Sequence, residues 1–186
     1  MAKWPNVPCV YGWLSLDRRG RWRLRDEPIT HPGANAFVGR NYGCDDHGNW
    51  FFQNGPQKVF VALEYTPWVV FSNVAGGLRT HTGLSVGTLL GVWLDDEGSL
   101  ILLTQYGPAL VCDRDLVDVL SRFRSENGRG LSDAELAVAL ESTGDTGEKG
   151  LAFDWRGVLL PVGRIPRAQV PNRLSFVRCP ADLGKP

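Results

Sequence analysis

The sequence predicts an α+β fold, an antiparallel hairpin-rich β-sheet or partly open barrel with about three covering helices. Three observations carry this prediction. Short apolar runs that alternate with polar residues at period two, a pattern typical of half-buried strands, recur along the chain. Turn signals of the form D-x-x-G separate these runs and begin at Asp17, Asp45, Asp95 and Asp154. With 43% apolar residues, including seven Trp and eight Phe, the chain of 186 residues can bury a substantial core.

The stretch of residues 44–72 is predicted to be a β-meander, in which three apolar runs are separated by D-D-H-G and N-G-P turns. In its middle run, Val59, Val61 and Leu63 share one face at period two. We therefore expect this strand to have one buried and one wetter side.

An earlier hairpin is predicted at residues 13–24, around the turn D-R-R-G. It gathers the concentrated basic surface of the chain, which consists of Arg18, Arg19, Arg21, Arg23 and Arg25. Basic residues interleaved with aromatic ones can bind nucleic acid, but charged edge strands also discourage pairing with other chains. Because Asp17, Asp26 and Glu27 offset much of the charge, we predict a solvated edge and no nucleic-acid partner.

Three helices are expected. The first begins where Thr30 or His31 can cap it and Pro32 can occupy an early position, and it continues to about residue 42. The other two form a helical pair within residues 113–142, the first reaching about residue 124 and the second starting at a capping box, S-D-A-E. The later chain is predicted to form a hairpin at residues 153–160, a loop at 161–171 and a last short strand at 174–177.

We expect one compact unit, which could consist of two closely packed lobes, an N-terminal α/β lobe of residues 1–76 and a β lobe of residues 77–186. The motif T-H-x-G occurs at residues 30–33 and again at 80–83, and each copy precedes a D-D-x-G turn by the same interval. This register indicates an internal repeat of about 50 residues. The alternative is that common turn signals recur by convergence.

The overall charge excludes a bulk electrostatic attraction to nucleic acid or to an anionic membrane, since 20 basic residues balance 20 acidic ones. No apolar run is long enough to span a bilayer, and the first residues form no signal peptide. The four cysteines are far apart and form no C-x-x-C pair. These features predict a soluble, cytoplasmic protein without a membrane partner.

No sequence motif indicates a catalytic centre, a P-loop or a dinucleotide site, and we expect no cofactor. Cys44 and His47 are weak metal-ligand candidates, because the turn that they flank needs no metal. His31 and His81 are the candidates for a ligand site, with Arg79 and Thr80 as added donors. Each histidine follows a Thr at a chain reversal, where an imidazole could complete an anion pocket or simply cap its own turn.

A pattern of turns and core positions resembles a known family. It comprises G-x-W at residues 20–22, Pro28-Ile29, a short helix, D-x-x-G at 45–48, and then Pro56, Lys58-Val59, Val61, Glu64 and Pro67. Over the first half of the chain, this pattern is similar to the proteobacterial family of unknown function numbered 1285. The resemblance implies a β-rich cytoplasmic protein in which a small N-terminal α/β element leads into a barrel-like sheet. It brings no catalytic residue, because none is established in that family.

We carry three hypotheses of function. The first is a binding or interaction module with a regulatory, small-ligand role, whose partner is a small molecule or a protein. The second is a hydrolase-type enzyme that uses His31 or His81 with an Asp or a Cys. The third is nucleic-acid binding through the Arg18–Arg25 hairpin.

Overall fold

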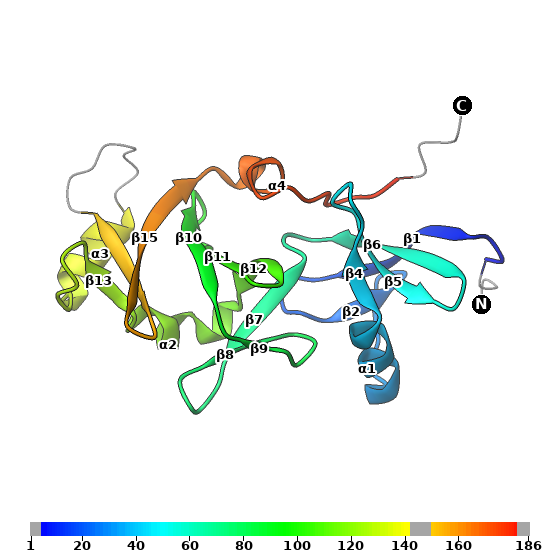
Figure 1. The fold of residues 1–186 in the computed structure, drawn as a ribbon, viewed down its shortest axis with the longest axis horizontal. Coiled ribbons are helices and arrows are strands. Elements are labelled where there is room, and N and C mark those ends of the chain that lie inside the picture. Colours follow the sequence, from blue (N-terminus) through cyan, green and yellow to red (C-terminus); the bar gives the residue numbers. More distant parts are fainter. Residues whose placement is uncertain (1–4, 142–149, 182–186) are drawn as a thin grey trace.

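A computed structural model describes residues 5–141 and 150–181 as an elongated molecule built on two mixed β-sheets, which lie end to end along its long axis (Figure 1). The first sheet has six strands, and the second has nine and curls into a half-barrel. Helices pack around both sheets, so the predicted α+β class is confirmed. No helix in the described ranges is long and apolar enough to cross a membrane.

The first sheet has the strand order β3-β2-β1-β6-β5-β4. The predicted N-terminal hairpin and first helix are confirmed, and the helix starts at Pro32 as expected from its early proline. The elements are β1 (Cys9–Leu16), β2 (Trp22–Leu24), β3 (Glu27–Pro28), α1 (Pro32–Arg40), β4 (Tyr42–Cys44), β5 (Trp50–Asn54) and β6 (Gln57–Leu63).

The second sheet has the order β13-β14-β15-β10-β11-β12-β7-β8-β9. Its strands are β7 (Trp68–Ser72), β8 (Leu78–Thr80), β9 (Ser85–Val86), β10 (Leu89–Asp95), β11 (Leu100–Thr104), β12 (Gly107–Val111), β13 (Phe123–Ser125), β14 (Leu151–Trp155) and β15 (Val158–Ile165). The helical segments of this part are η1 (Asp113–Asp115), α2 (Leu116–Leu120), α3 (Asp133–Glu141), η2 (Arg167–Gln169) and α4 (Val170–Arg173).

Two parts of the chain share one strand order. In the first unit (β1 to β6), β1 pairs in parallel with β6, and in the second unit (β10 to β15), β10 pairs in parallel with β15. Each unit thus runs from a three-stranded antiparallel segment, through a helix, to a second such segment that returns beside the first strand. Even single hydrogen bonds correspond, since Gln53 donates its N–H to the carbonyl of Asn41 and Asp154 donates to that of Arg122.

The correspondence follows another register than the T-H-x-G motifs suggest. Residues 30–33 enter α1, whereas residues 80–83 form the turn between β8 and β9, so the two copies have different structures. The strand pairing instead matches Asp17 with Asp95. Asp17 directly follows β1, and Asp95 is the last residue of β10.

One type of turn occurs six times in the described residues. Its first residue donates its N–H to the carbonyl four positions on, and the glycine at the fourth position donates back to the first carbonyl. The glycines have positive φ, where a side chain would be strained. The predicted turns at Asp17, Asp45 and Asp95 are confirmed, and the first residues are Asp17, Asp45, Asn73, Thr80, Asp95 and Ser125.

The predicted three-stranded meander is wrong in its last strand. β4, β5 and β6 are consecutive neighbours, but β7 leaves the first sheet and pairs with β8 and β12 in the second. Val69 and Val70 are both buried, so β7 has no wet face and fits the middle of a larger sheet. The division into lobes at residue 76 stays a prediction, although β7 lies in the nine-stranded sheet.

Three further expectations differ from the structure. The first helix of the pair ends at Leu120, because Phe123 lies in β13 opposite Phe153 and the two buried rings meet edge to face. The expected loop after residue 160 continues as β15 to Ile165, which hydrogen bonds with both β14 and β10 hold in place. The expected strand at residues 174–177 begins with the turn that ends α4, at Leu174 and Ser175, and makes only a single bridge, Asn49 to Val177.

Candidate functional site

The main candidate is a cleft of about 520 Å³ at the junction of the two sheets. One wall carries Arg18, Arg19, Arg21 and Arg23 from the β1–β2 hairpin, and we call these four residues the arginine wall. The opposite wall belongs to the second unit, and we call its two carboxylates, Glu97 and Asp113, the acidic wall. The remaining lining residues are Asp17, Glu64, Gly98, Ser99, Leu100, Leu110, Val111 and Leu116.

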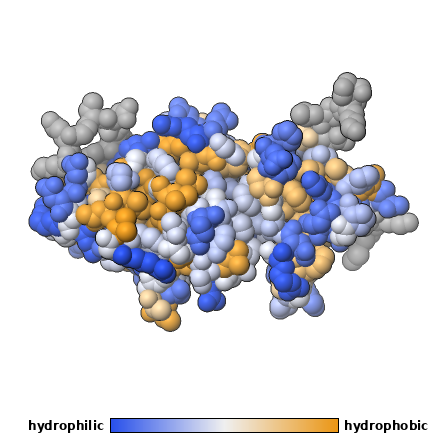
Figure 2. Space-filling model, in the orientation of Figure 1, coloured by the Kyte–Doolittle hydropathy of each residue, from blue (hydrophilic) through white to orange (hydrophobic). Residues whose placement is uncertain are grey.

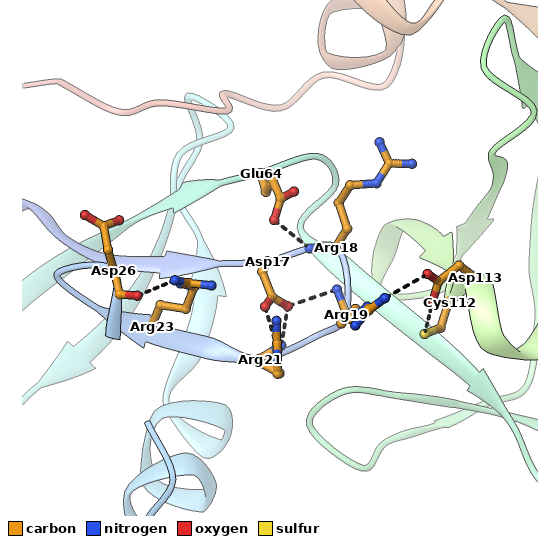
Figure 3. A network of polar contacts seen from close by, with 9 residues as sticks. All are labelled: Asp17, Arg18, Arg19, Arg21, Arg23, Asp26, Glu64, Cys112 and Asp113. Atoms are coloured by element: carbon orange, nitrogen blue, oxygen red, sulfur yellow. Dashed lines mark hydrogen bonds and ion pairs between the residues drawn. The ribbon is translucent and has the colours of Figure 1, made fainter. Parts of the chain in front are cut away.

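Asp17 organises the arginine wall. One carboxylate oxygen accepts the backbone N–H groups of Arg19 and Arg21, both at 2.9 Å, and the other accepts Nε of Arg21 at 2.6 Å (Figure 3). The side chain of Asp17 is only 5% exposed. Its negative charge is therefore paired within the hairpin, and the carboxylate stabilises the turn that carries the arginines.

Arg18 ties the two walls together at one end. Its backbone N–H donates to Glu64, and its guanidinium donates to Oγ of Ser99 at 2.8 Å. The same guanidinium lies 4.9 Å from the ring centre of Tyr65, a cation–π contact. The Tyr65 hydroxyl donates to the buried Asp95 at 2.6 Å, and burial followed by this hydrogen bond raises the pKa of Tyr65. This end of the cleft is thus fixed by a buried network.

Arg19 and Asp113 meet across the cleft at 3.5 Å, with exposed fractions of 56% and 65%. Asp113 also accepts hydrogen bonds from the thiol of Cys112 and the N–H of Arg114. The thiol contributes most to lowering the pKa of this carboxyl, followed by the Arg114 N–H and the Arg19 charge. Asp113 therefore stays ionised at neutral pH, and its pair with Arg19 is open to water and weak.

The carboxylates that line the cleft have partners inside the protein. Asp17 binds Arg21, Glu64 accepts the N–H of Arg18, and Glu97 pairs with Arg167. The guanidiniums are less fully used, because Arg21 donates only through Nε and Arg23 only through one Nη, to a backbone carbonyl. Several N–H donors of the arginine wall therefore have no hydrogen-bond partner among the described residues.

His31, the first predicted site residue, lies away from this cleft. It is exposed and caps α1, where its Nδ1 accepts the N–H of Ala34 at 3.2 Å. Arg79 is exposed on β8, and the buried Thr80 accepts the N–H of Leu84 within its own turn. None of the predicted ligand residues, His31, His81, Arg79 and Thr80, lines the cleft. A ligand site at these residues stays a prediction.

His81 lies in an aromatic junction between the sheets. The rings of Trp22, Tyr42 and Trp68 have centroids 5.0, 5.9 and 5.4 Å from its own. Its Nδ1 accepts the N–H of Val69, while Nε2 is buried and has no hydrogen-bond partner in the described chain. Burial lowers the pKa of His81 to about 3. The imidazole is therefore neutral at physiological pH.

Of the weak metal candidates, Cys44 is the last residue of β4 and His47 lies in the turn after it. Asp45 accepts the N–H groups of His47 and Asn49, and these hydrogen bonds stabilise the turn without a metal ion. Partial burial, and then the charges of Asp45 and Asp46, raise the pKa of Cys44, so its thiol is a poorer ligand at neutral pH. Residues 5–141 and 150–181 contain no group of three or more His, Cys, Asp or Glu side chains arranged for a metal ion.

A second hollow, of about 720 Å³, lies between α3 and the turn that begins at Ser125. Its ionic contact, Arg129 with Glu135, belongs to the capping box of α3, and most other lining side chains are apolar or small. Figure 2 shows that apolar residues also gather over the second sheet on the face in view. The cleft is more specific, because several charged groups converge in it.

Sequence reasoning found the arginines of the site but missed its opposite wall. The signal that could have found Glu97 is the equivalence of two D-x-x-G turns, since residues 17–20 and 95–98 both contribute to the cleft. Nothing local marks Asp113 or Glu64. Their position depends on how the two sheets meet.

Two solved structures are similar to this chain. A crystal structure of a DUF1285 family protein from Silicibacter pomeroyi DSS-3 has a TM-score of 0.56 and 14% identity, over 82% of this chain and 80% of that chain. A DUF1285 family protein from Shewanella baltica OS155 has a TM-score of 0.42 and 18% identity, over 57% of this chain and 91% of that chain. The first match confirms the predicted resemblance as a likeness of fold, and it extends beyond the first half of the chain.

The chain matches no curated protein. A family model described as "Protein of unknown function (DUF2946)" matches residues 1–181, and the chain belongs to that family.

Proposed function

We propose that this protein is a binding module that holds a small molecule with an anionic group in the cleft between the β1–β2 hairpin and the second unit. The observation that carries the proposal is the arginine wall, in which four arginines line one cavity while Asp17 and Glu64 beside them accept hydrogen bonds from the same hairpin. Guanidinium groups bind carboxylates and phosphates through paired N–H donors. The cavity, about 520 Å³, has the size of a small-molecule site.

The geometry gives less support to a hydrolase. His81 is enclosed by aromatic rings, and its lowered pKa removes the basicity that a general base needs. The exposed His31 uses Nδ1 to cap α1. Neither histidine lines the cleft, and no nucleophile lies within hydrogen-bond distance of either imidazole among the contacts of the described chain.

Nucleic-acid binding is also less well supported. Four arginines in the lining face four carboxylates, Asp17, Glu64, Glu97 and Asp113, so the formal charge of the lining is zero. A site for a polyanionic backbone would carry a net positive charge. Arg25, the last arginine of the hairpin, lies over the ring of Trp13 at 3.6 Å and does not line the cleft.

We also propose a cytoplasmic location. The cysteines Cys9, Cys44, Cys112 and Cys179 are all free, which suits a reducing compartment. A regulatory role fits a protein that binds a metabolite without converting it.

The test is ligand binding by purified protein, measured by thermal shift and calorimetry with inorganic phosphate, acetate, succinate and a panel of amino acids. We expect at least one of these to bind the wild type and to lose at least tenfold in affinity in the double variant Arg19→Gln/Arg23→Gln. The matched control is Arg25→Gln, which changes an arginine of the same hairpin outside the cleft and should bind normally. Absence of binding by every probe, or equal binding by the double variant, would refute the proposal.

A short single-stranded RNA serves as the competing ligand. If it binds more tightly than every small molecule, and the double variant abolishes that binding, the third hypothesis replaces ours.

A further inference from the structure

We infer that the ligand of this cleft is a small zwitterion of the amino-acid type, whose acid group meets the arginine wall and whose ammonium group meets the acidic wall. This inference rests on the proposed function. It adds the second charge of the ligand and assigns Asp113 and Glu97 a direct role in recognition.

The four arginines of the cleft lie on one wall, and two of its four carboxylates lie on the other. All four arginines come from the turn after β1 and from β2, whereas Glu97 and Asp113 come from the turn after β10 and from η1. Asp17 and Glu64, which are hydrogen-bonded to the arginine hairpin, offset two of its four positive charges. The arginine wall thus keeps a formal charge of about +2 against −2 on the acidic wall, so the cavity is dipolar and, as a whole, neutral. A dipolar, neutral ligand matches both walls, while a simple anion matches only one.

The two walls are in direct contact through one ion pair. Arg19 and Asp113 are 3.5 Å apart, and more than half of each side chain is exposed. A bound anion that takes Arg19 would leave the Asp113 carboxylate unpaired beside a negative charge. A ligand with an ammonium group replaces one ion pair by two, Arg19 with its acid group and Asp113 with its ammonium.

The acidic wall keeps free hydrogen-bond acceptors. Glu97 uses one carboxylate oxygen, Oε2, for Arg167, and its other oxygen has no hydrogen bond in the described chain. The bonds from Cys112 and Arg114 both go to Oδ1 of Asp113, so within residues 5–141 and 150–181 the polar contact of Oδ2 is with Arg19. Ser99 lies beside this wall, and its hydroxyl can donate to a ligand while it accepts from Arg18.

Apolar residues also line the cleft, where the uncharged part of the ligand would lie. Between the charged walls, the lining consists of Leu100, Leu110, Val111 and Leu116, of which the first three are buried core residues. Leu116 is partly exposed, and its side chain can contact an aliphatic or aromatic substituent of the ligand. The cleft therefore combines the groups that recognise an amino acid with an apolar side chain.

The experiment compares matched probes. The twenty free amino acids are screened first, and the tightest is then compared by calorimetry with its deaminated acid and its decarboxylated amine. For leucine these would be 4-methylpentanoate and 3-methylbutylamine. We expect each analogue, which lacks one charge, to bind at least tenfold more weakly than the amino acid.

The variant Asp113→Asn separates the two charges further. It should weaken the amino acid at least tenfold and leave the deaminated acid unchanged or bound more tightly, because the competitor of Arg19 is lost. Asp46→Asn, which changes an exposed aspartate in the turn after β4, is the matched control and should bind as the wild type does.

Two outcomes would overturn the inference. If acetate, succinate or phosphate binds through the arginine wall and no amino acid binds better than its deaminated acid, the proposed function stands and the zwitterion is wrong. If no probe binds at all, both proposals fail.

Discussion

The turns at residues 17–20 and 95–98 have the same backbone and opposite roles. Each lies at the end of the strand of its unit that makes the parallel pairing, and each begins with a buried aspartate that accepts the N–H groups two and four positions on. The middle residues are two arginines in the first turn and Asp96 and Glu97 in the second. The same turn conformation thus occurs twice, and it places arginines on one side of the cleft and Glu97 on the other.

The two aspartates also differ in their third partner. Asp17 binds Arg21 of its own turn, whereas Asp95 accepts the hydroxyl of Tyr65 from the segment between β6 and β7. The first turn is therefore complete by itself. The second depends on a residue that lies between the two sheets in the sequence, and this dependence couples it to the junction.

The largest expected effect follows from this difference. Asp95→Ala should lower the free energy of unfolding by about 3 kcal/mol, because it leaves the buried Tyr65 hydroxyl and two turn N–H groups without an acceptor. Asp17→Ala should cost only about 1.5 kcal/mol, since the half-exposed Arg21 can turn to water. Urea unfolding measures both. Equal losses would show that the two turns are independent of the junction.

Acid should weaken the junction through His81. Burial lowers the pKa of this imidazole to about 3 in the native protein, whereas the pKa in the unfolded chain is about 6.5. Between these two pH values the unfolded chain binds a proton at His81 and the native protein does not. Stability is thus present above pH 6.5 and is lost as the pH falls toward 3, by about 1.4 kcal/mol per pH unit from this group.

The test compares urea unfolding between pH 7 and pH 4.5. His81→Gln should flatten the slope, and the same change at the exposed His47 is the matched control. Should His81→Gln fail to fold, the imidazole resonances of the wild type can be titrated by NMR. A His81 resonance that shifts with a midpoint near 6.5 would contradict the expectation.

The smallest effect concerns the glycines of the two turns. Gly20 and Gly98 have φ of 73° and 78°, so an alanine costs about 1 kcal/mol of backbone strain at either position. A Cβ on Gly20 would also lie 2.7 Å from Cβ of His81 and 3.1 Å from the ring of Phe71, whereas nothing lies within 4 Å at Gly98. Gly20→Ala should therefore be the more destabilising, by about a further 1 kcal/mol in thermal or urea unfolding. Equal losses would mean that His81 and Phe71 move enough to accommodate the added methyl group.

Local chemistry determined the parts that the sequence predicted correctly. The D-x-x-G turns form because an aspartate and a glycine within four residues satisfy their own backbone groups. The capping box of α3 forms because Ser132 and Glu135 exchange hydrogen bonds three residues apart. Such interactions depend on few neighbours, so the order of residues is enough to predict them.

Only the tertiary structure decided which strands became neighbours and which charges met. β7 joined the second sheet and Phe123 joined β13, because burial on both faces outweighed the local pattern. His81 became enclosed, and Asp113 came to face Arg19, through contacts between residues far apart in the chain. The sequence by itself determined the turns that carry the charges. Their convergence on one cleft depended on the packing of two sheets, a long-range arrangement that no short stretch encodes.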